Sequence, residues 1–118
     1  MPCVDVPGGS PVVGTAVQLY TCNGTAGQMW STSGDGTIRA LNLCLDARNG
    51  GVVPGTVVQV YTCNGTVAQQ WIAHPDRTLR NTKSGLCLEA EGGSSANGTR
   101  LLLQTCHGGP NQQWTQPS

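Results

Sequence analysis

The sequence predicts an all-β fold in which three repeats of about 40 residues share one core. Six cysteines fall into three pairs, each separated by 19 residues, and the pairs recur with a period of 41 and then 43. A Gln-x-Trp motif keeps the same two periods and ends at Trp30, Trp71 and Trp114. A fixed period of this length indicates a repeat architecture, because one such repeat cannot bury a core alone.

Short strands are expected in each repeat, because segments alternate apolar and polar residues with a period of two. The clearest are "TAVQLYTC" at 15–22 and "TVVQVYTC" at 56–63. Turn-forming stretches surround them, namely "PGG", "SGDG", "NGG", "PGT" and "GGSSANG". No segment has the 3.6-residue period of an amphipathic helix. We expect about four strands in each repeat, about twelve in all, with pseudo-threefold symmetry.

The 118 residues fit a single domain, 1–118, with repeats expected at 1–40, 41–82 and 83–118. The 17 glycines and 7 prolines predict many turns and a thin core that needs covalent support. Net charge is zero and the six basic residues are scattered, which speaks against nucleic acid or an anionic membrane as a partner. No apolar run could span a bilayer, and the first residues lack a signal-peptide pattern. We expect a monomeric module from a longer secreted protein.

The cysteines are expected to form one disulfide within each repeat: Cys3–Cys22, Cys44–Cys63 and Cys87–Cys106. Six cysteines permit fifteen pairings, but three equivalent repeats favour three equivalent bonds. A zinc site is the alternative, and no Cys-x2-Cys pair supports it. Each disulfide would close a loop of about 20 residues, worth about 3 kcal/mol in the chain-entropy model. Disulfides imply an oxidising compartment.

Two repeats carry a carboxylate and a tyrosine at positions that a strand pair would bring together. If the paired cysteines lie opposite each other on antiparallel strands, Asp5 lies opposite Tyr20 and Asp46 lies opposite Tyr61. Residues two apart on a strand share a face, so a strand glutamine joins each pair, and an asparagine follows in the next turn. The expected sets are Asp5, Gln18, Tyr20 and Asn23 in the first repeat, and Asp46, Gln59, Tyr61 and Asn64 in the second.

A carboxylate beside an aromatic ring suits a sugar. The C–H face of a sugar packs on the ring, and its hydroxyls donate charge-assisted hydrogen bonds to the carboxylate. Side-chain amides donate and accept at neighbouring hydroxyls. The structural alternative is that Asp5 and Asp46 only satisfy backbone groups in turns and that the tyrosines fill surface grooves.

The opposite face of the strands is expected to form the core. Tryptophans that repeat with the symmetry of a fold are more often core elements than binding surfaces, so they are expected to be buried too. The expected core includes Val4, Val17, Leu19, Trp30, Leu45, Val58, Val60, Trp71, Leu88, Leu101, Leu103 and Trp114.

Three motifs recur in register: "CVDV…QLYTC…QMW", "CLDA…QVYTC…QQW" and "CLEA…LLQTC…QQW". Over essentially the whole chain they resemble the motifs of ricin B-type lectins and family 13 carbohydrate-binding modules. The resemblance implies a β-trefoil that binds sugar, often as an appendage of a secreted glycoside hydrolase. It also implies that Gln28 and Gln69 support the sites by orienting the aspartates.

The chain departs from the family pattern just before these glutamines, where Asn is common. Gly27 and Ala68 stand there, and Asn23 and Asn64 are expected to replace the missing hydrogen bonds. Both asparagines, like Asn97, also begin Asn-Gly-Thr sequons. A glycan on the first two would cover the sites, which favours a secreting host without this pathway. The simpler alternative is that Asn-Gly makes a good turn.

The third repeat departs further from the pattern. Glu89 replaces Asp, Leu102 replaces the strand glutamine, and Gln104 replaces Tyr, while His107 and Asn111 remain as polar groups. The stacking ring is lost and the carboxylate is one methylene longer. We expect a weak or degenerate third site.

These observations predict a non-catalytic module that binds a polysaccharide containing galactose, arabinose or xylose, or a β-glucan. It needs no cofactor or metal. An enzyme is disfavoured, because a glycosidase needs two carboxyls about 5–9.5 Å apart in one cleft, whereas here they occur one per repeat. His74 and His107 lack the spacing of a metal site or a triad. The remaining alternative is a β-trefoil scaffold that binds or inhibits a protein.

Overall fold

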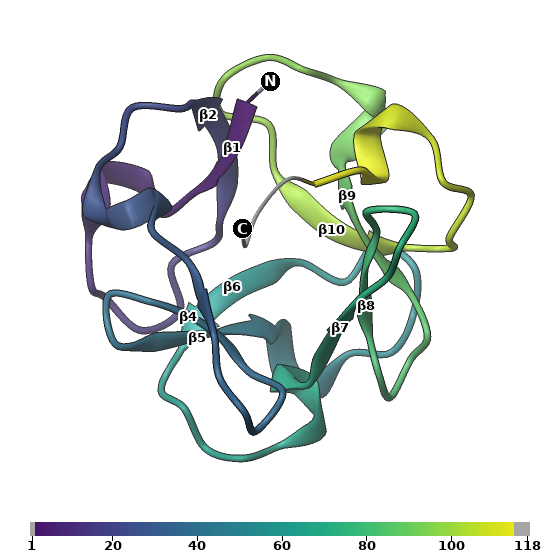
Figure 1. Ribbon diagram of the computed structural model, residues 1–118, viewed down its shortest axis with the longest axis horizontal. Helices are drawn as coiled ribbons and strands as arrows, with labels where there is room; N and C mark the ends of the chain where they lie inside the picture. The colour runs from purple at the N-terminus through teal and green to yellow at the C-terminus, as the bar shows by residue number, and fades with distance from the viewer. Residues whose placement is uncertain (1, 115–118) are drawn as a thin grey trace.

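The computed structural model of the chain describes residues 2–114, which form ten β-strands and six single-turn 3₁₀ helices. In Figure 1 the chain passes around a common centre, from the purple N-terminal lobe through a teal lobe to a green and yellow one. The strands are β1 (Pro2–Asp5), β2 (Gln18–Thr21), β3 (Ser31–Thr32), β4 (Ile38–Ala40), β5 (Leu43–Ala47), β6 (Val58–Tyr61), β7 (Trp71–Ala73), β8 (Leu79–Asn81), β9 (Cys87–Ala90) and β10 (Leu101–Gln104). The 3₁₀ turns are η1 (Pro7–Gly9), η2 (Ala26–Gln28), η3 (Arg48–Gly50), η4 (Val67–Gln69), η5 (Glu91–Gly93) and η6 (Pro110–Gln112).

The strand content agrees with four strands in each of the first two expected repeats. The third contributes β9 and β10, and its part beyond Trp114 lies outside the described residues. The sequence predicts about twelve strands in all, and the described part of the chain contains ten. The boundaries at 40 and 82 remain a prediction.

All strand pairs are antiparallel, in sheets ordered β1-β2, β3-β4-β5-β6 and β7-β8-β9-β10. Three isolated bridges join the lobes to one another: Ala16 to Gln59, Gln18 to Arg100, and Val57 to Leu102. Each lobe is thereby bonded to the other two, so none has to bury its apolar face alone. The described part contains no helix long and apolar enough to cross a membrane.

The core consists of the strand face that the alternation predicts. Leu45, Leu88, Val60 and Leu103 are fully buried at its centre. Trp71 and Trp114 are buried in the same cluster, as expected, and Trp30 is partly buried against it. Their indole N–H groups donate at 2.9–3.0 Å to the carbonyls of Val4, Leu45 and Leu88, in each case 26 residues earlier. The repeated tryptophan therefore ties the segment after the second cysteine of each repeat to the first strand of that repeat.

The three expected disulfides are present, with Cα–Cα distances of 5.1 Å in Cys3–Cys22, Cys44–Cys63 and Cys87–Cys106. The expected strand register is wrong by two residues. Cys3 lies opposite Tyr20 and Cys44 opposite Tyr61, so the aspartates lie opposite the strand glutamines. The reason is that the second cysteine of each pair comes after the strand has ended, and the bond runs diagonally. A shift of two keeps every side chain on its predicted face.

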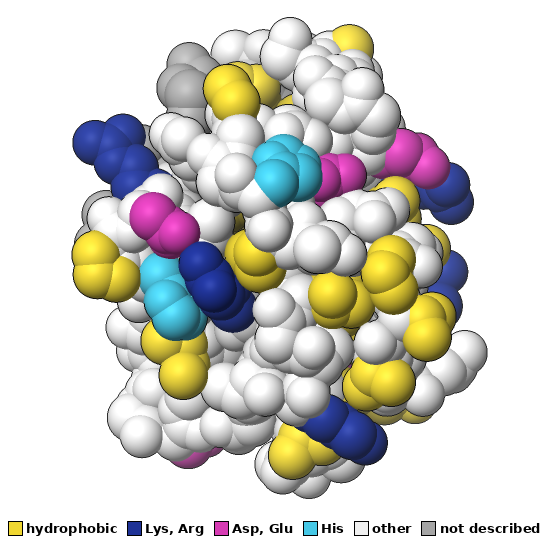
Figure 2. All heavy atoms as spheres, turned by 90° about the vertical axis from the view of Figure 1, so that its right-hand side faces the viewer, with side chains coloured by type: hydrophobic (Ala, Val, Ile, Leu, Met, Phe, Trp, Pro, Cys, Tyr) yellow, Lys and Arg dark blue, Asp and Glu magenta, His cyan; other side chains and the backbone are white. Residues whose placement is uncertain are grey.

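On the face shown in Figure 2, charged side chains stand in small scattered groups, several of which place an acidic side chain beside a basic one or a histidine. Two of the four ion pairs among the described residues are local. Arg39 pairs with Asp35 and Arg80 with Asp76, each four residues apart in equivalent hairpins. Hydrogen bonds from Thr37, followed by Arg39, lower the pKa of Asp35 to about 2, and Thr78 lowers the pKa of Asp76 in the same way.

Candidate functional site

The first two repeats each form an open pocket around the predicted carboxylate. The pocket of the first repeat has a volume of about 340 Å³. Asp5 at the end of β1, Gln18 and Tyr20 on β2, and the turns η1 and η2 line it. Asp5 is buried, whereas Tyr20 is 41% exposed. A recessed carboxylate beside an open ring is the arrangement expected from the sequence.

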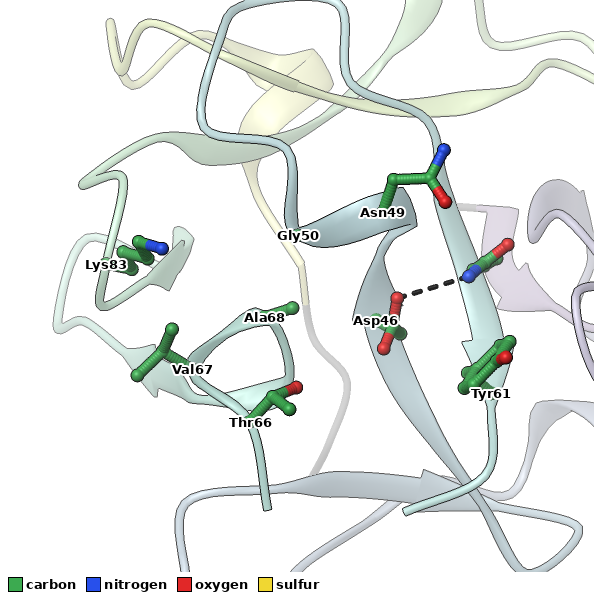
Figure 3. Close-up of a pocket in the computed structure, with 9 residues that line it drawn as sticks. Asp46, Asn49, Gly50, Tyr61, Thr66, Val67, Ala68 and Lys83 are labelled. Carbon is green, nitrogen blue, oxygen red and sulfur yellow. Dashed lines mark hydrogen bonds between the residues drawn. The ribbon is translucent and has the colours of Figure 1, made fainter. Parts of the chain in front are cut away.

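The pocket of the second repeat is similar and larger, about 450 Å³. Figure 3 shows Asp46 beside Tyr61, which is 40% exposed, with Asn49 at the neighbouring turn η3. Val67 and Lys83 lie on the opposite side. Sequence reasoning missed Asn49, Lys83 and Thr66 as lining residues, because they lie in turns whose position depends on the folded chain.

Both aspartates are held by two glutamine side chains. In the first repeat Gln18 Nε2 donates to Asp5 Oδ2 at 2.9 Å, and Gln28 Nε2 donates to Oδ1 at 3.1 Å. In the second, Gln59 and Gln69 donate to Asp46 at 3.2 and 2.9 Å. Within the described residues, the donors to the two carboxylates are side-chain amides. This differs from the structural alternative, in which the aspartates would satisfy backbone groups in turns. Each carboxylate, held in this way, has further lone pairs that can accept hydrogen bonds from a ligand in the pocket.

The glutamine of the Gln-x-Trp motif lies behind the aspartate and not on the pocket surface. Gln69 Nε2 also donates to the Thr62 carbonyl at 2.9 Å, and Asn64 N donates to Gln69 Oε1 at 3.0 Å. Gln28 makes the equivalent bonds with Thr21 and Asn23. Each glutamine thus connects the carboxylate to the residues on both sides of the second cysteine.

The asparagines after the cysteines are used within their own turns. Asn23 Oδ1 accepts from the backbone N and hydroxyl of Thr25 at 3.1 and 2.7 Å, and Asn64 is bonded to Thr66 in the same way. Asn23 lines the first pocket, whereas Thr66 lines the second in place of Asn64. The departure at Gly27 has a steric reason, because a Cβ there would lie 2.9 Å from the Val6 carbonyl oxygen.

The third repeat keeps the supporting glutamine and adds a histidine contact to the carboxylate. Gln112 Nε2 donates to Glu89 Oε1 at 2.9 Å, and His107 Nε2 contacts the same oxygen at 3.0 Å. The Gly109 amide donates to His107 Nδ1 at 2.9 Å, so Nε2 carries the proton in the neutral ring. Sequence reasoning missed Gln112 as a partner of Glu89, although the third Gln-x-Trp motif marks it.

The other two residues expected at the third site do not line one pocket: Asn111 lines an opening of about 150 Å³, and Gln104 does not. Asn111 donates to the Ala90 carbonyl at 3.3 Å, and Gln104 pairs with Cys87 across the strands. Within residues 2–114 no group of three His, Cys, Asp or Glu side chains could hold a metal ion.

Comparison with known proteins identifies the family and the fold. The family model of the ricin-type beta-trefoil lectin domain matches residues 1–114. The designed threefold-symmetric protein ThreeFoil is 30% identical with a TM-score of 0.89, covering 96% of this chain and 88% of its own. A non-toxic homologue of type II RIPs from Momordica charantia, solved with α-methyl-D-galactoside, is 30% identical with a TM-score of 0.84. The match covers 96% of this chain but 42% of that one.

A curated relative adds a different context. A glucan endo-1,3-beta-glucosidase of Cellulosimicrobium cellulans is 51% identical over 39 residues, which is 33% of this chain and 7% of that enzyme. The chain therefore spans a small part of that relative. The family match runs through all three repeats, and the chain belongs to the family of ricin-type β-trefoil lectin domains.

Proposed function

We propose that the chain is a non-catalytic carbohydrate-binding module with two sugar sites, one in each of the first two repeats. The observation that carries this proposal is the pair of matching pockets, each with a recessed aspartate beside a half-exposed tyrosine. The aspartate is the acceptor for sugar hydroxyls and the ring is the platform for the C–H face. Gln18 holds the Asp5 carboxylate in place and Gln59 holds that of Asp46, each through one hydrogen bond.

The third repeat is proposed not to bind. One oxygen of its carboxylate already has two partners, His107 and Gln112, and Gln104 offers no ring for stacking. We therefore expect two sites per chain and not three.

Each site is shallow and offers one ring, so affinity for a single sugar should be about 0.1–1 mM, or about −4 to −5.5 kcal/mol. Two such sites on one rigid body add avidity of about 10²-fold on a polymer that reaches both. Such a module would hold a linked, secreted glycoside hydrolase on its polysaccharide. The partial match to a glucan endo-1,3-beta-glucosidase supports this role, and the galactoside complex of the Momordica relative supports galactose among the candidate sugars.

The test is the series Tyr20→Ala, Tyr61→Ala and the double variant, with titration calorimetry on oligosaccharides and affinity electrophoresis on polysaccharides. Each single variant should halve the stoichiometry and lose much of the avidity. The double variant should lose nearly all binding while keeping its circular dichroism spectrum. Gln104→Ala is the matched control on the equivalent strand of the third repeat and should change little.

Two results would contradict the proposal. Full binding by the double variant, with loss in Glu89→Ala or His107→Ala, would make the third repeat the working site. No retention of the wild-type chain on any polysaccharide would favour the protein-binding scaffold.

A further inference from the structure

The two proposed sugar sites differ in charge. Lys83 lines the second pocket, whereas no Lys, Arg or His lines the first. Figure 3 places Lys83 across the pocket from Asp46 and Tyr61. Its side chain is exposed and makes no ion pair or hydrogen bond with residues 2–114. The second pocket therefore has the proposed hydroxyl acceptor Asp46 on one side and the unpaired Lys83 ammonium group on the other.

Lys83 reaches this position because the chain is two residues longer there. Six residue steps separate Asn81 from Cys87, whereas four separate Ala40 from Cys44 at the equivalent place. This insertion is the reason that the repeat period changes from 41 to 43. The shorter turn of the first repeat, at Leu41 and Asn42, does not line the first pocket.

The longer turn is fastened to the pocket wall. Asn81 is 1% exposed, and its Nδ2 donates to the carbonyls of Val67 and Ala68 in η4 at 3.3 and 3.4 Å. Its Oδ1 accepts from the backbone N of Ser84 at 3.1 Å, and Thr82 N donates to the Gln70 carbonyl at 3.0 Å. These bonds fix both sides of Lys83 against η4, which lines the pocket. The lysine Cα is thus held in place while its amine stays available.

A second cation stands near the same site. Arg48 Nε donates to Gln59 Oε1 at 2.8 Å, and Gln59 in turn donates to Asp46. The equivalent position in the first repeat is Pro7. Lys83 lines the second pocket and Arg48 is linked to its carboxylate through Gln59, whereas the lining residues of the first pocket include no cation. Two positive groups near one carboxylate favour a negative ligand.

We propose that the second site prefers a uronic acid, a sugar residue that carries a carboxylate, and that the first site takes neutral sugars. The inference rests on the proposed function. Asp46 and Tyr61 receive the hydroxyls and the C–H face, and the Lys83 ammonium pairs with the sugar carboxylate at the far side of the pocket. Such a pair is charge-assisted and, being exposed, is weakened by salt.

The test isolates each site in the full 118-residue chain. Tyr20→Ala leaves the second site and Tyr61→Ala leaves the first. The probes are uronic-acid-bearing oligosaccharides, namely glucuronoxylan and galacturonan fragments, each compared with its carboxyl-reduced neutral form. In the Tyr20→Ala chain the acidic form should bind about three- to fivefold more tightly at low salt. Addition of 1 M NaCl should remove the difference.

Further substitution of the Tyr20→Ala chain identifies the source of the preference. Lys83→Gln should abolish it and Lys83→Arg should retain it. Arg77→Gln removes one positive charge outside both pockets and should leave the preference intact. The Tyr61→Ala chain should bind acidic and neutral forms equally.

Equal binding of the two forms by the Tyr20→Ala chain would overturn the inference and leave the proposed function standing. A preference that survives Lys83→Gln would overturn it as well. If neither single-site chain binds any probe or neutral polysaccharide that the wild-type chain binds, the site assignment fails and the inference fails with it.

Discussion

Replacing the glutamine of the Gln-x-Trp motif by alanine should destabilise the fold equally in the second and third repeats. We propose that the second repeat binds sugar and that the third does not. Gln69 and Gln112 are both fully buried. Each donates to a carboxylate oxygen and to a backbone carbonyl, and each accepts from the backbone N that follows a cysteine. Gln112 Oε1 also accepts from the Gly108 backbone N at 3.2 Å. Gln69→Ala and Gln112→Ala therefore remove three equivalent hydrogen bonds, and a fourth in Gln112→Ala, from a repeat that we propose binds and from one that we propose does not.

The size of the effect follows from the partners left behind. In the second repeat these are one oxygen of Asp46, the Thr62 carbonyl and the Asn64 N–H. An unsatisfied buried group costs about 1–3 kcal/mol, and a charged one costs more. Because Thr62 and Asn64 are exposed, water can bond to the freed carbonyl and N–H groups and recover part of the lost free energy. We expect about 2–4 kcal/mol for each variant, against a total stability of about 5–15 kcal/mol.

Urea unfolding with the disulfides intact, followed by tryptophan fluorescence, measures these values. Gln70→Ala is the matched control, because Gln70 is the neighbour of Gln69 and its side chain is only partly buried; it should stay within about 0.5 kcal/mol of wild type. A Gln112→Ala chain as stable as wild type would refute the reasoning. So would a Gln69→Ala chain that loses sugar binding without losing stability, since the glutamine would then act as a ligand contact.

Two further predictions concern the core and the acid limit. Trp71→Ala should destabilise the domain by about 3–5 kcal/mol in the same unfolding assay, because the indole is buried and bonded to the Leu45 carbonyl; normal stability with lost sugar binding would contradict its place in the core. Hydrogen bonds from Thr37 hold the pKa of Asp35 at about 2, below its ordinary 3.8, so its contribution to stability is complete above pH 4 and lost as the pH falls through 2. The stability difference between wild type and Asp35→Asn should therefore be constant above pH 4 and shrink toward pH 2. A difference that grows on acidification would contradict a lowered pKa for Asp35.

Much of the fold was predictable because its periodic features are written in the sequence. The spacing of the cysteines predicts the three disulfides, and the alternation of residues such as Val58 and Val60 predicts the buried strand face. The Gln-x-Trp motif predicts where the tryptophans pack. These features depend on short-range geometry that every repeat shares.

The details that distinguish the sites were not predictable in the same way. The register was misjudged because Cys22 and Cys63 lie beyond their strand ends, where the chain turns. The position of Lys83 depends on contacts of the inserted turn with η4. The contact of His107 with Glu89 depends on a turn in which the Gly109 amide donates to the ring. Each of these features depends on how a turn lies in the folded chain, which the repeated sequence pattern does not define.

The third repeat separates the part of the motif that folds the chain from the part that we propose binds sugar. Glu89, Gln112 and Trp114 keep the bond between motif glutamine and carboxylate and the indole bond to the first strand, which Asp46, Gln69 and Trp71 also make. The repeat nevertheless has Gln104 where the others have tyrosine. The carboxylate, glutamine and tryptophan therefore form a structural unit that the fold needs in every repeat, and the ring and the turn residues are a separate layer on its surface. Within residues 2–114, no side-chain hydrogen bond or ion pair joins Tyr61 or Lys83 to this unit. We therefore expect that exchanging either residue alters sugar preference without altering the fold.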